Sequence, residues 1–287
     1  MCSRFPDRIG WAARGLLLPP LVLALAGAAS LTRPGAGPAR LRVCADPNNL
    51  PFSNSREEGF ENRLAALMAR EMGARVAYTW WPQRRGFFRE TLNAGRCDVV
   101  MGVPAGLQSL ATTRPYYRST YVFVTRRSES LQLRSFDDPV LRGLRIGVQL
   151  AGGAEGTTPP VYALARRGLM DQVEGYSLYA DYARPNPPAR VLDALARGEV
   201  DVAVTWGPLA GYFAPREPVR LRVSPVAPAV DASGVPLTFA IAVGVRKGDE
   251  RLRIALDRIL ERRQREIQRI LDDYGVPRVA IADEERP

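Results

Sequence analysis

Two segments of the chain repeat one order of residue types, and this repetition limits the folds that the chain can adopt. The segments are TLNAGRCDVVM (91–101) and ALARGEVDVAV (194–204). Each passes from a helix-forming stretch through a glycine, a common helix terminator, to an aspartate and a short apolar run typical of a buried strand. We therefore expect two lobes that are built alike.

Strand-like and helix-like segments alternate around both copies of this repeat. Apolar runs predict strands at 41–45, 75–81, 97–103, 144–149, 173–179 and 201–206. Apolar residues at helical spacing predict helices at 59–73, 86–96, 162–169 and 188–200. Such alternation is typical of βαβ units with a parallel-type central sheet, so the predicted fold class is α/β.

Two further strands are expected to connect the lobes. The β-rich run 120–127 leaves the first series, and the apolar run 236–247 returns to it before one long predicted helix at 249–275. The sequence thus predicts two α/β lobes joined by two β-hinge crossings. Lobe 1 is predicted to be discontinuous, with residues 31–125 plus 237–287, and lobe 2 to hold residues 126–236.

The first 30 residues have the features of an export signal. Basic residues precede the apolar stretch GLLLPPLVLALAGAA (15–29), and small residues ending at Ala28 fit a cleavage site. Pro19 and Pro20 interrupt that stretch, which is shorter than the roughly 18 residues that a lasting membrane span needs. We expect residues 1–30 to be removed as a signal peptide, leaving a protein of the periplasm that is not inserted into the membrane.

Two cysteines, Cys44 and Cys97, remain after the predicted signal. An even number of cysteines in an oxidising compartment favours a disulfide. Against it, Cys44 lies late in its predicted strand and Cys97 at the start of another, a stagger of about 10 Å if the strands are parallel neighbours. That exceeds the reach of a disulfide. The two alternatives, a disulfide and two buried thiols, both stay open.

The segments RVCADPNNLPFS (42–53) and TTRPYY (112–117) resemble the bacterial periplasmic solute-binding proteins of family 3, which bind polar amino acids. The resemblance covers residues 38–280 and implies the type II periplasmic binding-protein fold. A narrower resemblance is to the J-type (MxaJ/XoxJ) accessory proteins. It rests on six segments in order: LRVCADPNNLPFSN, GFENRLAALMA, YTWWPQRRGF, GRCDVVMGVPAG, TTRPYYRSTYVFVTR and WGPLAGYFA.

The J-type resemblance implies a role beside a PQQ-dependent methanol dehydrogenase and its cytochrome c, in maturation or activation, with no cofactor of its own. Family 3 receptors hold the carboxylate of an amino acid with an arginine and its ammonium group with an acid. Here residues 104–111, where the arginine belongs, contain no basic residue, and Thr205-Trp206-Gly207-Pro208 stands where the acid belongs. Amino-acid capture is therefore not expected.

The candidate site residues lie at the ends of the predicted strands and in the loops beside them. Because the carboxyl ends of strands in open α/β sheets face the ligand crevice, we expect aromatic rings there, with an anion-binding pair of arginines at a nearby helix start. The first loop and a Gly-rich loop at 150–160 complete the predicted cleft. The candidates are Asp46, Asn48, Asn49, Trp80, Trp81, Arg84, Arg85, Tyr116, Tyr117, Thr157 and Trp206. In each adjacent aromatic pair, one ring is expected to face the core instead.

Catalysis finds little support in the residue types. The chain has no histidine, which excludes a His-based triad and His metal ligands, and two cysteines 53 residues apart make no zinc site. We predict a non-catalytic protein without a metal site that binds a partner protein or an unknown small ligand, but no nucleic acid. The alternatives are the substrate-binding component of an ABC transporter for a small aromatic or carboxylated solute, and an enzyme such as a cyclodehydratase.

Overall fold

The computed structural model of the 287-residue chain describes residues 39–150, 157–178, 182 and 186–279. The predicted signal peptide at 1–30 lies outside the described residues. Most of the described strands form one sheet whose main path is β4-β1-β5-β12-β7-β10-β8-β9. Off this path, β6 pairs with β12 and β11 with β7, and β2-β3 is a separate small hairpin. Lobe 1 and lobe 2 are the names used below for two groups of helices and strands. The boundaries at 31–125, 126–236 and 237–287 remain predictions.

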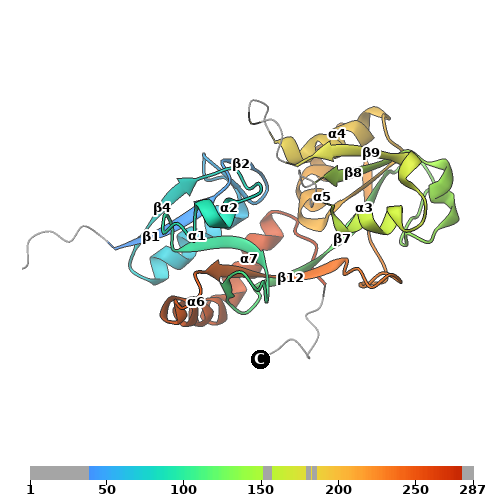
Figure 1. The fold of residues 1–287 in the computed structure, drawn as a ribbon. Helices are drawn as coiled ribbons and strands as arrows, with labels where there is room; N and C mark the ends of the chain where they lie inside the picture. The colour runs from blue at the N-terminus through green and yellow to red at the C-terminus, as the bar shows by residue number, and fades with distance from the viewer. Residues whose placement is uncertain (1–38, 151–156, 179–181, 183–185, 280–287) are drawn as a thin grey trace, which may run out of the picture. The chain divides into compact units, whose positions relative to one another are not determined.

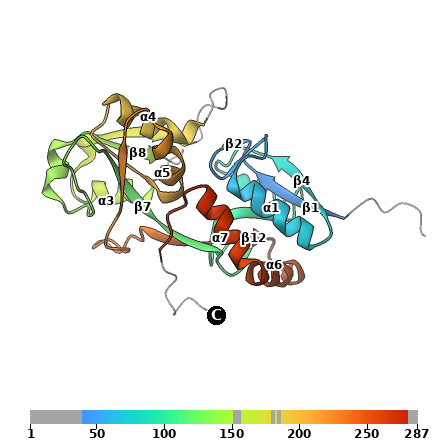
Figure 2. The ribbon, with the colours of Figure 1, turned by 180° about the vertical axis from the view of Figure 1, so that it is seen from behind.

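Lobe 1 is built on parallel strands. Its strands are β1 (Arg40–Ala45), β2 (Asn48–Asn49), β3 (Ser53–Asn54), β4 (Arg75–Trp80), β5 (Val99–Pro104), β6 (Ala111–Thr112) and β12 (Thr238–Val245). Its helices are α1 (Phe60–Glu71), α2 (Phe87–Glu90), α6 (Glu250–Arg262) and α7 (Gln264–Asp273). β1 pairs in parallel with β4 and with β5, and β12 closes this half of the sheet antiparallel to β5. Figure 2 shows α1, α6 and α7 grouped beside one another.

Lobe 2 repeats the plan. Its strands are β8 (Ile146–Leu150), β9 (Val173–Ser177), β10 (Val202–Trp206) and β11 (Leu221–Pro225). Its helices are α3 (Pro159–Ala165), α4 (Arg190–Arg197) and α5 (Gly207–Phe213), with short 3-10 turns at Pro139–Gly143, Met170–Gln172, Pro187–Ala189 and Ala214–Arg216. β8 pairs in parallel with β9 and β10. The predicted α/β fold of the type II periplasmic binding proteins is confirmed.

One long strand, β7 (Tyr117–Arg126), belongs to both halves of the sheet (Figure 1). Its first residues pair with β12, from Tyr117 opposite Ile241 to Thr120 opposite Thr238. Its remaining residues pair with β10, from Tyr121 opposite Trp206 to Thr125 opposite Val202. β7 and the segment that leads into β12 are thus the two crossings between the lobes.

Each half of the sheet is covered on both faces, as the alternation of side chains requires. In β10, Val202 and Val204 pack with α3, while Ala203, between them, packs with α4 and α5. In β1, Leu41 and Val43 pack under α1, and Cys44 packs on the opposite face with Phe87. Such two-sided burial explains why these strands are continuous apolar runs in the sequence.

Two predicted helices differ from the structure. The helix expected at 249–275 is two helices, α6 and α7, separated at Arg263. Residues 261–265 are all exposed, so no buried side chain holds the helix straight there, and α7 packs separately on α1. The helix expected at 86–96 ends at Glu90, because residues 91–96 form turns in which Gly95 takes a positive φ of 72°.

No helix among the described residues is long and apolar enough to cross a membrane.

Candidate functional site: an aromatic cavity between strand ends

A cavity of about 320 Å³ opens beside the ends of β5 and β10 and the first turns of α1 and α3. This volume is at the lower end of the range found for small-ligand sites. Both lobes and both crossing strands contribute to its walls. The lining residues are Asn49, Phe52, Glu61, Gln83, Gly102, Pro104, Tyr117, Tyr121, Gln149, Thr158, Pro159, Leu178, Trp206, Leu209, Phe239 and Ile241.

Three rings form one wall of the cavity. Tyr121 of β7, Trp206 of β10 and Phe239 of β12 contact one another edge to face, with centroids 5.2 Å apart for Tyr121 and Trp206, 5.9 Å for Trp206 and Phe239, and 6.5 Å for Tyr121 and Phe239. These separations are those at which aromatic pairs attract. β7, β10 and β12 therefore meet through aromatic contacts at the cavity.

The position of Trp206 is fixed by the helix that follows it. Gly207 and Pro208, which follow Trp206, are the first residues of α5, where proline fits because the first amide groups have no helical partner. A Cβ at Gly207 would lie 2.7 Å from the carbonyl oxygen of Thr120 in β7. Glycine thus permits the close approach of α5 to β7 that keeps the indole at the cavity wall.

Glu61, in the first turn of α1, supplies a carboxyl group to the cavity. The residue is only 9% exposed, and no hydrogen bond reaches its carboxyl group from the described residues. Burial without a compensating charge disfavours the ionised form. It raises the pKa of Glu61 to about 8. The carboxyl group is therefore largely protonated at neutral pH while the cavity is empty.

Asp46, just past β1, is buried behind the cavity wall and organises the first loop. Its carboxylate accepts hydrogen bonds from the backbone amides of Asn48 (2.8 Å) and Gln83 (2.6 Å) and from the hydroxyl of Tyr182 (2.6 Å). The last bond comes from the chain of lobe 2. Because its oxygens already accept these bonds, Asp46 acts as a structural acceptor that orients the loop around Asn49 and Gln83.

The wall on the lobe 2 side is polar but uncharged. The hydroxyl of Thr205 donates to the side-chain oxygen of Gln149 (2.6 Å), whose amide donates to the carbonyl of Pro188 (3.0 Å). The hydroxyl of Thr158 donates to the backbone carbonyl of Gln149 (2.9 Å). All three side chains are buried, so this network fixes the start of α3 at the cavity without adding a charge.

Three predicted site residues line the cavity: Asn49, Tyr117 and Trp206. The others lie elsewhere. Asp46 and Asn48 are in the supporting loop; Asn48 accepts a bond from the amide of Asn186 (3.2 Å). Thr157 is exposed beside Thr158, which lines the cavity in its place.

The remaining predicted rings and arginines are not in the cavity wall. Trp80 stacks on Tyr78 at 4.4 Å, and the guanidinium of Arg96 lies 5.0 Å from the ring centre of Trp81. Tyr116 is buried in the core of lobe 1, as expected for one member of its pair. Arg84 and Arg85 are exposed, and α2 has only four residues, so they do not form the expected anion site at a helix start.

Sequence reasoning missed several lining residues, above all Glu61, Tyr121, Phe239 and Gln149. One signal was available for Glu61, because it is a charged residue next to Phe60 on the buried side of a helix whose other apolar positions are Leu64, Leu67 and Met68. The crossing strands gave no comparable signal, since their aromatic residues look like ordinary strand residues until the pairing of β7 with β10 and β12 is known.

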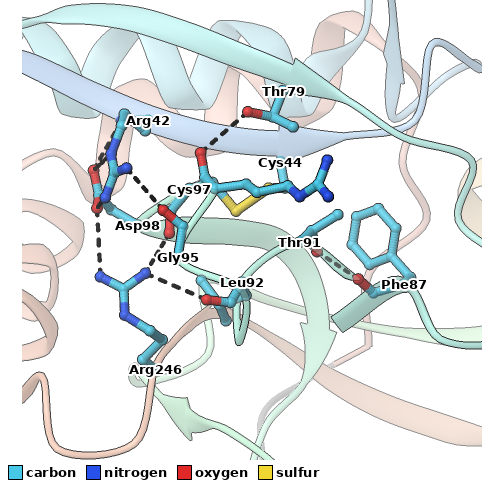
Figure 3. Close-up of a disulfide and its surroundings, with 11 residues drawn as sticks. Arg42, Cys44, Thr79, Phe87, Thr91, Leu92, Gly95, Cys97, Asp98 and Arg246 are labelled. Carbon is cyan, nitrogen blue, oxygen red and sulfur yellow. Dashed lines mark hydrogen bonds and ion pairs between the residues drawn. A yellow bond between two sulfur atoms is a disulfide. The ribbon is translucent and has the colours of Figure 1, made fainter. Parts of the chain in front are cut away.

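Lobe 1 contains a disulfide between Cys44 and Cys97 (Figure 3). The predicted register is close to that observed, with Cys44 opposite Val100, but β5 begins only at Val99. Cys97 thus precedes the strand, and the chain turns to bring its Cα to 5.5 Å from that of Cys44. The objection from strand stagger was wrong because it assumed that Cys97 continues the line of β5.

An ion pair holds the same turn in place. Asp98 accepts hydrogen bonds from the side chain of Arg42 at 2.5 and 3.1 Å, and Arg42 also reaches the carbonyl of Gly95 at 2.8 Å (Figure 3). Arg246 of β12's following turn bonds to the carbonyl of Cys97. The pKa of Asp98 lies below its usual range because hydrogen bonds and the charge of Arg42 outweigh its partial burial.

Comparisons with known proteins agree with this architecture. The model of the bacterial extracellular solute-binding proteins, family 3, matches residues 41–277. Protein MoxJ of Methylorubrum extorquens is 33% identical over 268 residues, which cover 89% of this chain and 86% of that protein. The chain therefore belongs to the bacterial extracellular solute-binding proteins of family 3.

Two solved structures place the similarity within that family. The periplasmic binding protein XoxJ from Methylobacterium extorquens AM1 matches with a TM-score of 0.68 and 35% sequence identity, over 84% of this chain and 100% of that chain. MxaJ from Methlophaga aminisulfidivorans MPT matches with a TM-score of 0.70 and 26% identity, over 83% of this chain and 100% of that chain. The predicted resemblance to the J-type proteins is thus confirmed.

Proposed function

We propose that this chain is a non-catalytic periplasmic accessory protein of a PQQ-dependent methanol dehydrogenase system. In this proposal, the aromatic cavity binds a segment of the dehydrogenase or of its cytochrome c and assists maturation or activation. The J-type relatives support the association with methanol oxidation, and the family supports the periplasmic location.

The position of Trp206 in the cavity wall is the observation that carries the proposal. Trp206 ends β10, at the position where the amino-acid receptors of this family are expected to hold a charge of their ligand, and it contacts β7 and β12 through Tyr121 and Phe239. No basic residue is among the described residues that line the cavity. An amino acid would leave its carboxylate without a partner there, whereas an inserted side chain of a partner protein would fill a desolvated aromatic pocket of the kind found at binding hot spots.

The residue types at the cavity favour binding over catalysis. Glu61 is the one carboxyl group among the described lining residues, and Asp46 behind the wall already accepts three hydrogen bonds. A single carboxyl group can transfer a proton, but no histidine, lysine or second carboxyl group lines the described part of the cavity to complete an acid–base pair. No cluster of three or more His, Cys, Asp or Glu residues suited to a metal ion occurs in the described part of the chain.

The proposal is tested by affinity capture. The mature protein, residues 31–287, is immobilised and exposed to periplasmic extract of the bacterium that produces it. We expect capture of the dehydrogenase or its cytochrome c, and loss of capture with Trp206→Ala. The matched control is Trp80→Ala, which removes an indole outside the cavity. Absence of both proteins from the captured fraction, together with normal dehydrogenase activity in a deletion strain, would overturn the proposal.

A transport receptor is the second candidate, because a cavity of about 320 Å³ is large enough for a small solute. For this function the neighbouring reading frames should encode a permease and an ATPase instead of a quinoprotein and a cytochrome. Native mass spectrometry of protein isolated from its own periplasm would distinguish a retained small molecule from a retained protein partner.

A further inference from the structure

Among the described residues, none supplies a counter-ion to the carboxyl group of Glu61. The titratable groups around it are Tyr78 of β4 and the neighbouring residues Tyr116 and Tyr117. Burial raises the pKa of all three hydroxyls, so they are uncharged at neutral pH. The nearest arginine of the same helix, Arg63, is paired with Asp273 at 2.8 Å.

The start of α1 does not compensate the carboxyl group either. The backbone amide of Phe60 donates to the carbonyl of Pro51 (2.8 Å), and that of Glu61 donates to the carbonyl of Phe52 (2.9 Å). These two amides, which would otherwise favour an anion at a helix start, are therefore occupied by the first loop. Within the described part of the chain, the ionised form of Glu61 thus has no partner, so a ligand would supply it.

The backbone keeps space for this carboxyl group. Gly102 of β5 has a φ of +70°, and a Cβ at this residue would lie 2.1 Å from Oε1 of Glu61. A side chain at residue 102 would therefore displace the carboxyl group from the cavity wall. The glycine and the buried acid together form a built feature of the wall.

Aromatic rings complete the surroundings of Glu61. Tyr117, Tyr121 and Trp206 line the same cavity, and the faces of such rings attract organic cations. We propose that the cavity binds an alkylammonium group, with Glu61 as its counter-ion and these rings around it. This inference rests on the proposed function, because it names the chemistry of the group that the cavity receives. The group could belong to a free amine or to a lysine side chain of the partner.

The first experiment measures binding of butylammonium to the mature protein by isothermal titration calorimetry. 1-Butanol, which has the same shape without the charge, is the ligand control. Because binding requires the ionised carboxylate, the affinity for butylammonium should rise on the order of fiftyfold between pH 6 and pH 8, given a pKa of about 8 for Glu61. Proton release should accompany binding at pH 7. An affinity that is constant or falls with pH would overturn the inference.

Variants separate Glu61 from general charge effects. Glu61→Gln should reduce butylammonium affinity at pH 8 at least tenfold and abolish its pH dependence, while 1-butanol binding stays unchanged. The control Glu58→Gln removes an exposed carboxylate of the preceding loop that pairs with Arg56, and it should leave both ligands unaffected. If Glu61→Gln fails to fold, Trp206→Leu serves in its place, with the same loss expected. Equal butylammonium affinity of wild type and the folded variant would contradict the inference.

A second arm distinguishes the two sources of the cation. Nα-acetyl-lysine-amide presents a lysine side chain without a free carboxylate, and its Nζ-acetylated form is the control. Preference for the lysine compound over butylammonium assigns the cavity to a partner's side chain, and the reverse preference assigns it to a free amine. Failure of all ammonium probes with successful capture of the dehydrogenase would overturn only this inference; binding of ammonium probes without capture would overturn only the proposed function.

Discussion

In each lobe, an arginine in or just before one parallel strand (β1 or β8) bonds to the turn that precedes the strand beside it (β5 or β10). We call this set of contacts the clamp. In lobe 1, Arg42 bonds to Asp98 and to the carbonyl of Gly95. In lobe 2, Arg145 bonds to Asp201 at 2.7 and 3.1 Å and to the carbonyl of Gly198 at 2.8 Å. The repeated sequence pattern thus encodes a repeated set of contacts, in which an arginine in β1 or just before β8 fixes the aspartate and glycine that precede the neighbouring strand.

The lobes differ at the residues next to this clamp. Lobe 1 has Cys44 two residues after the arginine and Cys97 one before the aspartate, joined by a disulfide. The same positions of lobe 2 hold Gly147 and Val200, and a Cβ at Gly147 would already lie 3.2 Å from a methyl group of Val200. Close apolar packing thus occupies in lobe 2 the place of a covalent bond in lobe 1.

A second difference concerns charge at the cavity. Lobe 1 contributes the buried acids Asp46 and Glu61, whereas the corresponding loop and helix start of lobe 2 contribute Gln149 and Thr158. Among the described residues that line the cavity, the single carboxyl group thus comes from lobe 1 and none comes from lobe 2. The comparison teaches that a duplicated scaffold can keep its internal clamp while each copy takes a separate part of the binding chemistry.

The largest effect on stability is expected from removing the disulfide of lobe 1, which leaves that lobe with apolar packing alone, as in lobe 2. The double variant Cys44→Ala, Cys97→Val removes a bridge across 53 residues, which should lower the free energy of unfolding by about 4 kcal/mol on the chain-entropy model. Urea denaturation of the oxidised wild type and the variant measures the difference. Wild type treated with reductant should match the variant, and equal midpoints for all three would show that the bridge adds nothing to the clamp.

The second largest effect on stability is expected from replacing Glu61, the carboxyl group in the lobe 1 wall, by a residue that cannot ionise. The folded protein keeps a proton on Glu61 up to about pH 8, and the unfolded chain loses it near 4.5, so stability falls as pH rises between these values. Glu61→Gln removes this fall and should raise the free energy of unfolding by roughly 3 kcal/mol at pH 7, with little change near pH 4. Denaturation from pH 4 to pH 8 tests this; parallel profiles for wild type and variant would refute it.

A smaller effect is expected in the uncharged network of lobe 2. Thr205→Val removes the hydrogen bond to Gln149 and leaves a buried amide oxygen without that donor, which should cost about 1–3 kcal/mol. Thr157→Val, at an exposed threonine, is the matched control and should change stability by less than about 0.5 kcal/mol. Thermal denaturation of both variants compares them, and equal losses would show that the network does not stabilise lobe 2.

The smallest effects concern the shared clamp. Asp98→Asn and Asp201→Asn should each lower stability by about 1 kcal/mol at neutral pH, since their closest arginine partners, Arg42 and Arg145, are largely exposed. The less exposed Arg246 and Arg126 lie farther away, at 3.5 Å from the same carboxylates. The pKa of each aspartate is lowered in the fold, so this contribution is present above the unfolded pKa and is lost as pH falls through the folded value. Acid titration should show a shallower decline for each variant. A much larger loss in one lobe would break the equivalence of the two clamps.

The sequence was a good guide to the scaffold and a poor one to the cavity. The alternation of strands and helices, the repeated Asp-apolar segments and the resemblance to family 3 led to the observed fold, because burial on both faces of a sheet has a direct pattern in the chain. The position of Trp206 followed from its place at a strand end.

The rest of the cavity depends on contacts that local patterns do not contain. Tyr121 and Phe239 meet only because β7 pairs with both β10 and β12, and Gln149 faces the site because Thr205 and Pro188 orient it. Trp80 and Trp81 were misplaced because stacking on Tyr78 and contact with Arg96 direct them away from the cavity wall. Strand-end position alone does not fix the direction of a side chain.

The placement of the indoles has an optical consequence. The described residues contain three tryptophans, and only Trp206 lines the cavity. A protein in which Trp80 and Trp81 are replaced by phenylalanine would, once the predicted signal with Trp11 is removed, emit from a single indole in contact with Tyr121 and Phe239. Its emission wavelength and quenching would report occupancy of the cavity and the packing of both crossing strands in one spectrum, without an added label.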